Sequence, residues 1–166
     1  MIVVAERLSE IALAEPVEEY ADSYGRSAFN RYYYATYLIA RDMLRQLNPS
    51  WTRTGHSEIP NLLTGAVITT VRKELRRQHK LGGLGAGESA SMGRDANTSV
   101  ADLSNLLKIA YEVRRVADYE PEQRILRNGR VIKLGEQTIE AARNWPRRAS
   151  AYTKSLIKIW RQLALS

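Results

Sequence analysis

The chain has 166 residues, no cysteine, two histidines and a formal net charge of +7. That length supports one domain with its own hydrophobic core, and the absence of cysteine excludes disulfides and thiolate metal ligands. The opening apolar run meets Glu6 and Arg7 at once, and no stretch is long and apolar enough to span a membrane. We therefore expect one domain over residues 1–166, located in the cytoplasm and with no membrane partner.

The positive charge is concentrated in one part of the chain. Residues 122–166 carry ten Lys or Arg and three Glu, which accounts for the whole excess, whereas the first twenty residues are acidic. A basic region of this kind is typical of proteins that bind a polyanion such as nucleic acid. It fits equally well a solvated surface that binds nothing.

Helical periodicity dominates the first half of the chain. Apolar residues recur at three- and four-residue spacing over about 2–14 and about 22–47, where Asn48-Pro49 stops the pattern. A third helix is expected over about 57–79, with a proline in its first turn. Its core stripe consists of Val67, Ile68, Val71 and Leu75.

Glycine and serine interrupt the pattern in the second half. The stretch 81–99, whose glycines fall within 82–93, is expected to be a flexible loop. A fourth helix is expected over about 99–118, closed by Pro121.

The last part of the chain combines a turn signal with another helix. Asn128-Gly129 lies between two apolar runs and predicts a short hairpin near residues 125–134. A final helix over about 135–165 follows, kinked or broken at Pro146. The fold class is therefore predicted to be all-α, an up-and-down bundle of about five helices with one short hairpin.

Most enzyme classes lack their motifs in this sequence. There is no HExxH, GxSxG or GxxxxGK[ST] pattern, and the acidic residues do not follow metal-ligand spacing. The run GGLGAGES, residues 82–89, resembles a phosphate loop but has no lysine and no preceding strand. We expect neither a metal nor a cofactor.

The sequence VRKELRRQHK, residues 71–80, ends the third helix with a basic face. Arg72, Arg76 and His79 share one side of this helix. An arginine beside a histidine suits metal-free phosphodiester cleavage, since the imidazole moves the 2′-hydroxyl proton and the guanidinium stabilises the phosphorane. The alternative is a soluble helix end whose cations complement the helix dipole.

The sequence YEVRRVADYEP, residues 111–121, ends the fourth helix with a charged cluster. Arg114 and Asp118 are four residues apart and can form an ion pair, and Tyr119 can pack its ring beside them. Such a cluster either fastens a helix end or contributes to a binding site.

Three segments, taken together, resemble HEPN-domain proteins. SAFNRYYYATYLIARDML resembles the family's first long helix, GHSEIPNLL is similar to its histidine-containing start of the next helix, and YEVRRVADYEP resembles its Arg-x-x-Ala-Asp-Tyr helix end. The segments follow the family's order and span about 26–121. The matching positions are Ser27, Arg31, Tyr33, Tyr34 and Ala35, then Arg114 or Arg115 with Ala117, Asp118 and Tyr119.

The resemblance implies a helical bundle that pairs as a homodimer and acts on or binds RNA. Family members occur in toxin–antitoxin, anti-phage defence and RNA-processing systems, some beside a minimal nucleotidyltransferase. The catalytic branch is a metal-independent endoribonuclease that uses an arginine followed by a histidine four to six residues later, near the end of a late helix.

This chain departs from the catalytic pattern. No histidine follows Arg114 and Arg115, and Asp118 cannot both give and take a proton near neutral pH as an imidazole does. We therefore expect a non-catalytic module that binds RNA, a nucleotide or a protein partner, with phosphate contacts from Arg26, Arg31, Arg114 and Arg115 and a structural cluster of Asp118 and Tyr119.

Two other hypotheses stay open. An endoribonuclease would need His56 to act with Arg114 or Arg115 across a dimer, or the pair Arg72 and His79 to act within its helix. A plain interaction subunit would use its charge for solubility alone.

Overall fold

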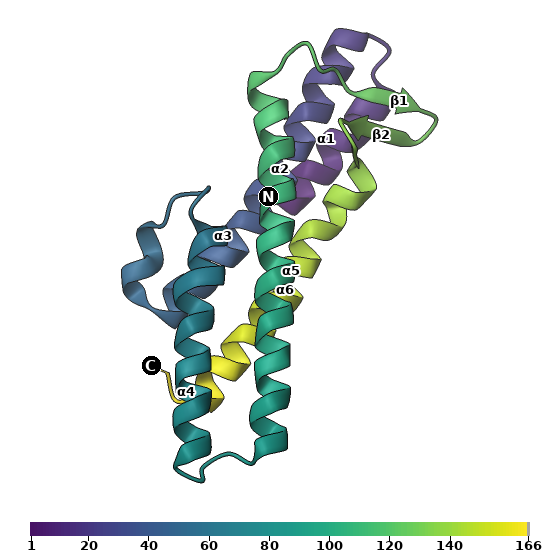
Figure 1. Ribbon diagram of the computed structural model, residues 1–166. Coiled ribbons are helices and arrows are strands. Elements are labelled where there is room, and N and C mark those ends of the chain that lie inside the picture. Colours follow the sequence, from purple (N-terminus) through teal and green to yellow (C-terminus); the bar gives the residue numbers. More distant parts are fainter. Residues whose placement is uncertain (166) are drawn as a thin grey trace. The chain divides into compact units, whose positions relative to one another are not determined.

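Helices make up most of the computed structural model, which describes residues 1–165 (Figure 1). In chain order the elements are α1 (Ile2–Ala14), α2 (Glu18–Leu47), the 3₁₀ helix η1 (Pro49–Arg53), α3 (Ile59–Leu62), the π-helical segment η2 (Leu63–Val67), α4 (Ile68–Lys80), α5 (Ala86–Tyr119), β1 (Leu126–Asn128), β2 (Val131–Leu134), β3 (Gln137–Thr138) and α6 (Ile139–Gln162). The all-α prediction with a short hairpin near residues 125–134 is confirmed. None of the helices within residues 1–165 is both long enough and apolar enough to cross a membrane.

Contacts between Cα atoms divide the chain into two compact units. The first unit contains Met1–Leu38 and Lys108–Arg148. The second contains Ile39–Leu107 and the chain from Ala149 onward.

The hairpin of the first unit forms where the turn signal placed it. β1 and β2 pair antiparallel, with Leu126 opposite Lys133 and Asn128 opposite Val131. Gly129 has φ +57°, a backbone conformation that costs glycine little and explains the Asn-Gly turn. The sequence did not indicate the two-residue strand β3, which pairs antiparallel with β2.

Large side chains from separate parts of the chain fill the core of the first unit. They are Phe29, Tyr32 and Tyr33 of α2, Ile132 and Leu134 of β2, and Trp145 of α6. Helix α1 instead buries its small residues Ala5, Ser9 and Ala12.

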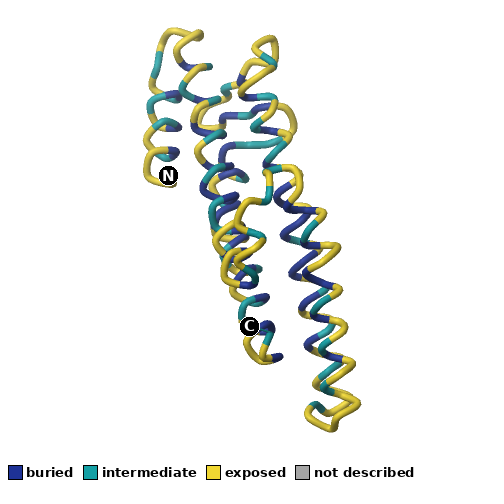
Figure 2. Tube along the Cα trace, turned by 90° about the vertical axis from the view of Figure 1, so that its left-hand side faces the viewer, coloured by how far each residue is buried: buried dark blue, intermediate teal, exposed yellow. Residues whose placement is uncertain are grey.

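The second unit confirms the predicted core stripe of the third helix, since Val67, Ile68, Val71 and Leu75 are all buried. Figure 2 shows buried positions recurring along one side of the helices. Trp51 and Trp160 meet edge to face with ring centroids 5.9 Å apart.

The π-helical segment η2 corrects the phase of this stripe. At about 100° per residue, a regular helix would point Ile68, Val71 and Leu75 about 130° away from the buried Ile59 and Leu63. A π turn holds one residue more than an α turn and rotates the following helix back by about 100°, which removes most of this difference. One continuous apolar face then serves α3, η2 and α4.

The predicted flexible loop over residues 81–99, including 82–93, is wrong. Only residues 81–85 lie between α4 and α5, because α5 already begins at Ala86. Met92, Ala96, Val100 and Leu103 recur at three- and four-residue spacing and are buried. Burial of this weak stripe outweighs the low helix propensity of the glycines and serines.

Of the two outcomes predicted for α6 at Pro146, a kink or a break, the structure excludes the break. The helix continues from Ile139 to Gln162 as one element with Pro146 buried inside it, so the proline does not break it. Its first residue follows Thr138, whose hydroxyl accepts a hydrogen bond from the backbone N–H of Ala141.

Candidate functional site

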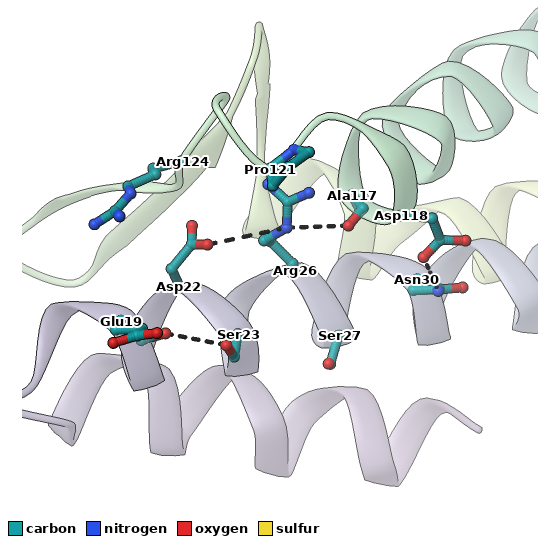
Figure 3. A pocket seen from close by; sticks show the side chains of 10 residues that line it. All are labelled: Glu19, Asp22, Ser23, Arg26, Ser27, Asn30, Ala117, Asp118, Pro121 and Arg124. Carbon is teal, nitrogen blue, oxygen red and sulfur yellow. Dashed lines mark hydrogen bonds and ion pairs between the residues drawn. The ribbon is translucent and has the colours of Figure 1, made fainter.

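Arg26, predicted as a phosphate ligand, instead binds the end of α5. In the first unit its guanidinium donates to the carbonyl oxygens of Val116 (2.9 Å), Ala117 (3.0 Å), Glu120 (3.1 Å) and Gln123 (2.7 Å). The last carbonyls of a helix have no partner within the helix, so a buried helix end needs donors from elsewhere. Arg26 supplies them, and its side chain is only 11% exposed (Figure 3).

The segment that follows α5 is fixed to α2 by two further contacts. The backbone N–H of Ile125 donates to Asp22 Oδ1 at 2.7 Å. A Cβ on Gly25 would lie 2.6 Å from Ile125 Cδ1, so any larger residue here would require the Ile125 side chain to move. These contacts join residues about a hundred positions apart in the sequence, so no local sequence pattern predicts them.

A polar cavity of about 430 Å³ opens beside Arg26 in the first unit (Figure 3). The carboxylates of Glu19, Asp22 and Asp118 and the guanidiniums of Arg26 and Arg124 line it together with Ser23, Ser27, Asn30, Ala117 and Pro121. Three carboxylates and two guanidiniums nearly cancel in charge, so the cavity does not favour an anion such as phosphate.

Arg114 forms the centre of a charged cluster at the end of α5. Its Nε lies 2.8 Å from Asp118 Oδ2, an ion pair rather than an aligned hydrogen bond. Its guanidinium carbon lies 5.1 Å from the ring centroid of Tyr119. Asn30 Nδ2 donates to Asp118 Oδ1 at 2.6 Å, which ties the cluster to α2.

Electrostatics keep Arg114 charged. Burial lowers its pKa, but the hydrogen bond with Tyr119, the charge of Asp118 and the hydrogen bond with Tyr34 outweigh burial, and the net shift is upward. The Arg114 side chain is 17% exposed. Within the cluster Asp118 is bonded on both carboxylate oxygens, whereas Tyr119 is exposed.

Tyrosines surround this cluster. The Tyr33 ring centroid lies 5.4 Å from that of Tyr34, 6.2 Å from that of Tyr37 and 6.1 Å from that of Tyr111. Burial raises the pKa of Tyr33, the neighbouring tyrosines add to this, and Arg114 opposes it without reversing it. Because its hydroxyl stays protonated near neutral pH, Tyr33 is unsuited to act as a base.

The other predicted phosphate ligands differ in their surroundings. Arg115 pairs with Glu112 at 3.1 Å and with Glu120 at 2.7 Å, and its side chain is about half exposed. Arg31 is exposed on α2.

Neither unit contains a pair of His56 with Arg114 or Arg115. His56 lies between η1 and α3 in the second unit, whereas both arginines belong to the first. The sequence of the first unit contains no histidine. No imidazole from this unit can therefore act as acid or base at the Arg114 cluster.

The second predicted pair, Arg72 and His79, lies on α4 in the second unit. Arg72 NH2 donates to Asn97 Oδ1 of α5, which ties its guanidinium to the neighbouring helix. His79 Nδ1 lies 3.2 Å from the carbonyl oxygen of Leu84 in the turn before α5. A carbonyl only accepts, so this contact assigns the ring proton to Nδ1 and leaves Nε2 as the basic nitrogen.

The exposed side of α4 carries a groove of about 500 Å³. The described residues that line it are Thr69, Lys73, Arg76, Arg77 and Lys80, so four of them are cationic and none is acidic. The groove lies opposite the buried stripe of Val71 and Leu75. A concave surface with this charge suits phosphate groups.

The sequence indicated a basic face at the end of this helix, but the predicted site residues there were Arg72 and His79. Lys73, Arg77 and Lys80 were not among the predicted site residues, although their spacing with Arg76 already placed all four on one helical face. The sequence feature that predicts the groove is this row of cations on the side of the helix opposite the apolar stripe.

Acidic and imidazole side chains do not gather into a metal site. Among residues 1–165 there is no group of three or more His, Cys, Asp or Glu placed to hold a metal ion.

Comparison of the chain with models of protein families, with curated proteins and with solved structures finds no match. The resemblance to HEPN-domain proteins stays a prediction from three sequence segments.

Proposed function

We propose that the protein is a non-catalytic helical module that binds RNA through the cations of α4. One observation carries this proposal: among the described residues that line the groove, Lys73, Arg76, Arg77 and Lys80 are cationic and none is acidic, and only Arg77 is paired with a carboxylate, that of Glu74. Phosphate contacts supply most of the affinity in sequence-independent nucleic-acid binding. The groove offers such contacts, whereas Arg26 and Arg114 are engaged within the protein.

The geometry of α4 fits an extended phosphate backbone. Lys73 and Lys80 are seven residues apart, which is about 10 Å along a helix. Arg76 lies between them on the same face, and its Nε donates to the carbonyl oxygen of Arg72 at 3.3 Å, which leaves its terminal nitrogens for a ligand. Lys73, Arg76 and Lys80 thus form a row of cations long enough for more than one phosphate.

The Arg114 cluster supports the non-catalytic part of the proposal. It has an arginine, an aspartate and tyrosines, but no histidine from its own unit. Asp118 is occupied by Arg114 and Asn30, and the raised pKa of Tyr33 keeps its proton in place. The first unit therefore supplies no imidazole to exchange protons there near neutral pH.

The test is equilibrium binding of a fluorescent single-stranded RNA in EDTA. The variant Lys73→Ala/Arg76→Ala/Lys80→Ala should bind at least about tenfold more weakly than wild type, since it removes the free cations of the groove. The matched control is Lys154→Ala/Lys158→Ala/Arg161→Ala, which removes the same charge from exposed positions of α6 in the same unit. If both variants lost RNA affinity equally, the loss would reflect net charge alone, and the groove would be rejected as the binding site.

A second candidate function is metal-independent RNA cleavage, favoured by the contact of His79 with Leu84. That contact leaves Nε2 to take a proton, and Arg76 lies one turn earlier on the same helix. His79→Ala and His56→Ala, each incubated with RNA in EDTA, test it. Cleavage by wild type that is lost in His79→Ala and kept in His56→Ala would establish this activity in place of a non-catalytic role.

The HEPN resemblance adds three proposals about context: a homodimer, a nucleotidyltransferase-like or other protein partner, and a role in a prokaryotic defence or toxin–antitoxin type system. Sedimentation equilibrium of the purified chain tests the first of these directly. A monomer at all accessible concentrations would remove it.

A further inference from the structure

Glu74 holds Arg77 in a fixed orientation on the exposed side of α4. Arg77 Nε lies 3.0 and 2.9 Å from the two carboxylate oxygens of Glu74, and Arg77 NH2 lies 2.6 Å from Oε1. Gln78 Nε2 donates to the same Oε1 at 2.9 Å, so the carboxylate is fixed from a second direction. The Glu74 side chain is 13% exposed, whereas that of Arg77 is 58% exposed.

This pairing changes what Arg77 offers to a ligand. Its charge is compensated by Glu74, which makes it a weaker phosphate ligand than Lys73 or Lys80. Its side chain is nevertheless more than half exposed, and the three contacts with Glu74 hold the guanidinium in one orientation. The hydrogen bond with Glu74 raises the pKa of Arg77, and the same bond lowers the pKa of Glu74, so both groups stay ionised around neutral pH.

An oriented guanidinium plane suits a nucleobase. Unpaired RNA bases stack on aromatic rings and on arginine planes, whereas the bases of a duplex are already stacked on each other. Arg77 lines the same groove as Lys73, Arg76 and Lys80. A strand whose phosphates follow the lysines would therefore bring a base over Arg77.

We infer that the Glu74–Arg77 pair is a stacking surface for one unpaired base and makes the groove select single-stranded RNA over duplex RNA. The inference rests on the proposed function, because it names the form of RNA that the α4 groove takes. Glu74 acts as a positioning residue, and Arg77 contacts the base.

Two variants distinguish the effect of the planar Arg77 guanidinium from the effect of its positive charge. Arg77→Lys keeps one positive charge but has no plane. Glu74→Gln keeps the side-chain shape but removes the charge that compensates and orients Arg77. Arg77 lies on the exposed side of α4, whereas Glu74 is only 13% exposed and lies between Arg77 and the buried stripe, so unfolding of Glu74→Gln is measured beside its binding.

The probes are a fluorescent single-stranded RNA of about ten nucleotides and the same strand in a duplex. Arg77→Lys should lose about tenfold in affinity for the single strand and little for the duplex. Glu74→Gln should steepen the salt dependence by about 0.7 in log–log slope, equal to one more phosphate contact, and should reduce the preference for the single strand.

A base analogue gives a direct readout of stacking. Strands carrying 2-aminopurine at each position in turn should show one position whose fluorescence is quenched by wild type and restored by Arg77→Lys. Unchanged single-strand affinity in Arg77→Lys, or an equal loss on the duplex, overturns the stacking surface while leaving RNA binding by the groove intact. Absence of any RNA binding by wild type overturns the proposed function and this inference together.

Discussion

Arg26→Ala should lower the free energy of unfolding by about 4 kcal/mol, because it removes the donor that serves four backbone carbonyls at the end of α5. The carbonyls belong to Val116 and Ala117 of α5 and to Glu120 and Gln123 of the chain that follows it. The change therefore loosens both the helix end and the chain that follows it.

The magnitude follows from the burial of the contact. A buried acceptor left without a partner costs about 1–3 kcal/mol. We take about 1 kcal/mol for each of the four carbonyls, the lower end of that range, because three of the bonds are only partly buried and the bond to Gln123 is exposed. Domains of this kind are stable by about 5–15 kcal/mol, so the loss is a large fraction of the total. The expected fall in Tm is about 8–16 °C.

The assay is thermal and urea unfolding followed by circular dichroism. The matched control is Arg31→Ala, which removes the same side chain from an exposed position of the same helix and should change stability by less than about 0.5 kcal/mol. Arg26→Lys should recover only part of the loss, because one ammonium group lacks the planar fork that reaches four carbonyls.

The reasoning would be refuted if Arg26→Ala were as stable as Arg31→Ala and yet bound RNA more weakly. Arg26 would then be the phosphate ligand that the sequence first indicated, and its bonds to α5 would be unimportant for folding.

Three further predictions test other parts of the fold. Gly25→Ala should destabilise the protein, since its Cβ would lie 2.6 Å from Ile125 Cδ1, and adding Ile125→Ala should recover part of the loss in unfolding free energy. Deleting Gly65 should leave stability within about 1 kcal/mol of wild type because a regular helix then keeps one apolar stripe, whereas deleting Thr70 should rotate the rest of α4 by about 100° and unfold the protein. The pKa of Glu74 is lowered in the folded state, so Glu74→Gln should be less stable than wild type at neutral pH, and the difference in urea titrations should shrink as the pH falls below the ordinary Glu pKa of about 4.3 and vanish below the lowered pKa of the folded state.

Local patterns allowed much of the fold to be predicted. The stripe of Val67, Ile68, Val71 and Leu75 and the Asn-Gly hairpin depend on near neighbours in the sequence, and both are confirmed. The first three turns of α5 were missed because their helical stripe rests on small residues and on burial against other parts of the second unit. Helix propensity alone cannot anticipate that burial.

Contacts between distant residues account for what was missed in the candidate site. The bonds of Arg26 to residues 116–123 and of Arg127 to the carbonyls of Ala12 (3.0 Å) and Glu15 (2.6 Å) each complete a helix end. A sequence shows that a cation is present but not whether a helix end or a ligand will occupy it. The cations of the α4 groove could have been predicted from the sequence, because a single helix carries all of them.

The most direct test of the central claim is the salt dependence of single-stranded RNA binding, measured in EDTA for wild type and for Lys73→Ala/Arg76→Ala/Lys80→Ala. Three phosphate contacts predict a wild-type log–log slope of about −2, which should approach zero in the variant. Equal slopes in the two proteins would contradict the account, because the cations that hold RNA would then lie outside the groove of α4.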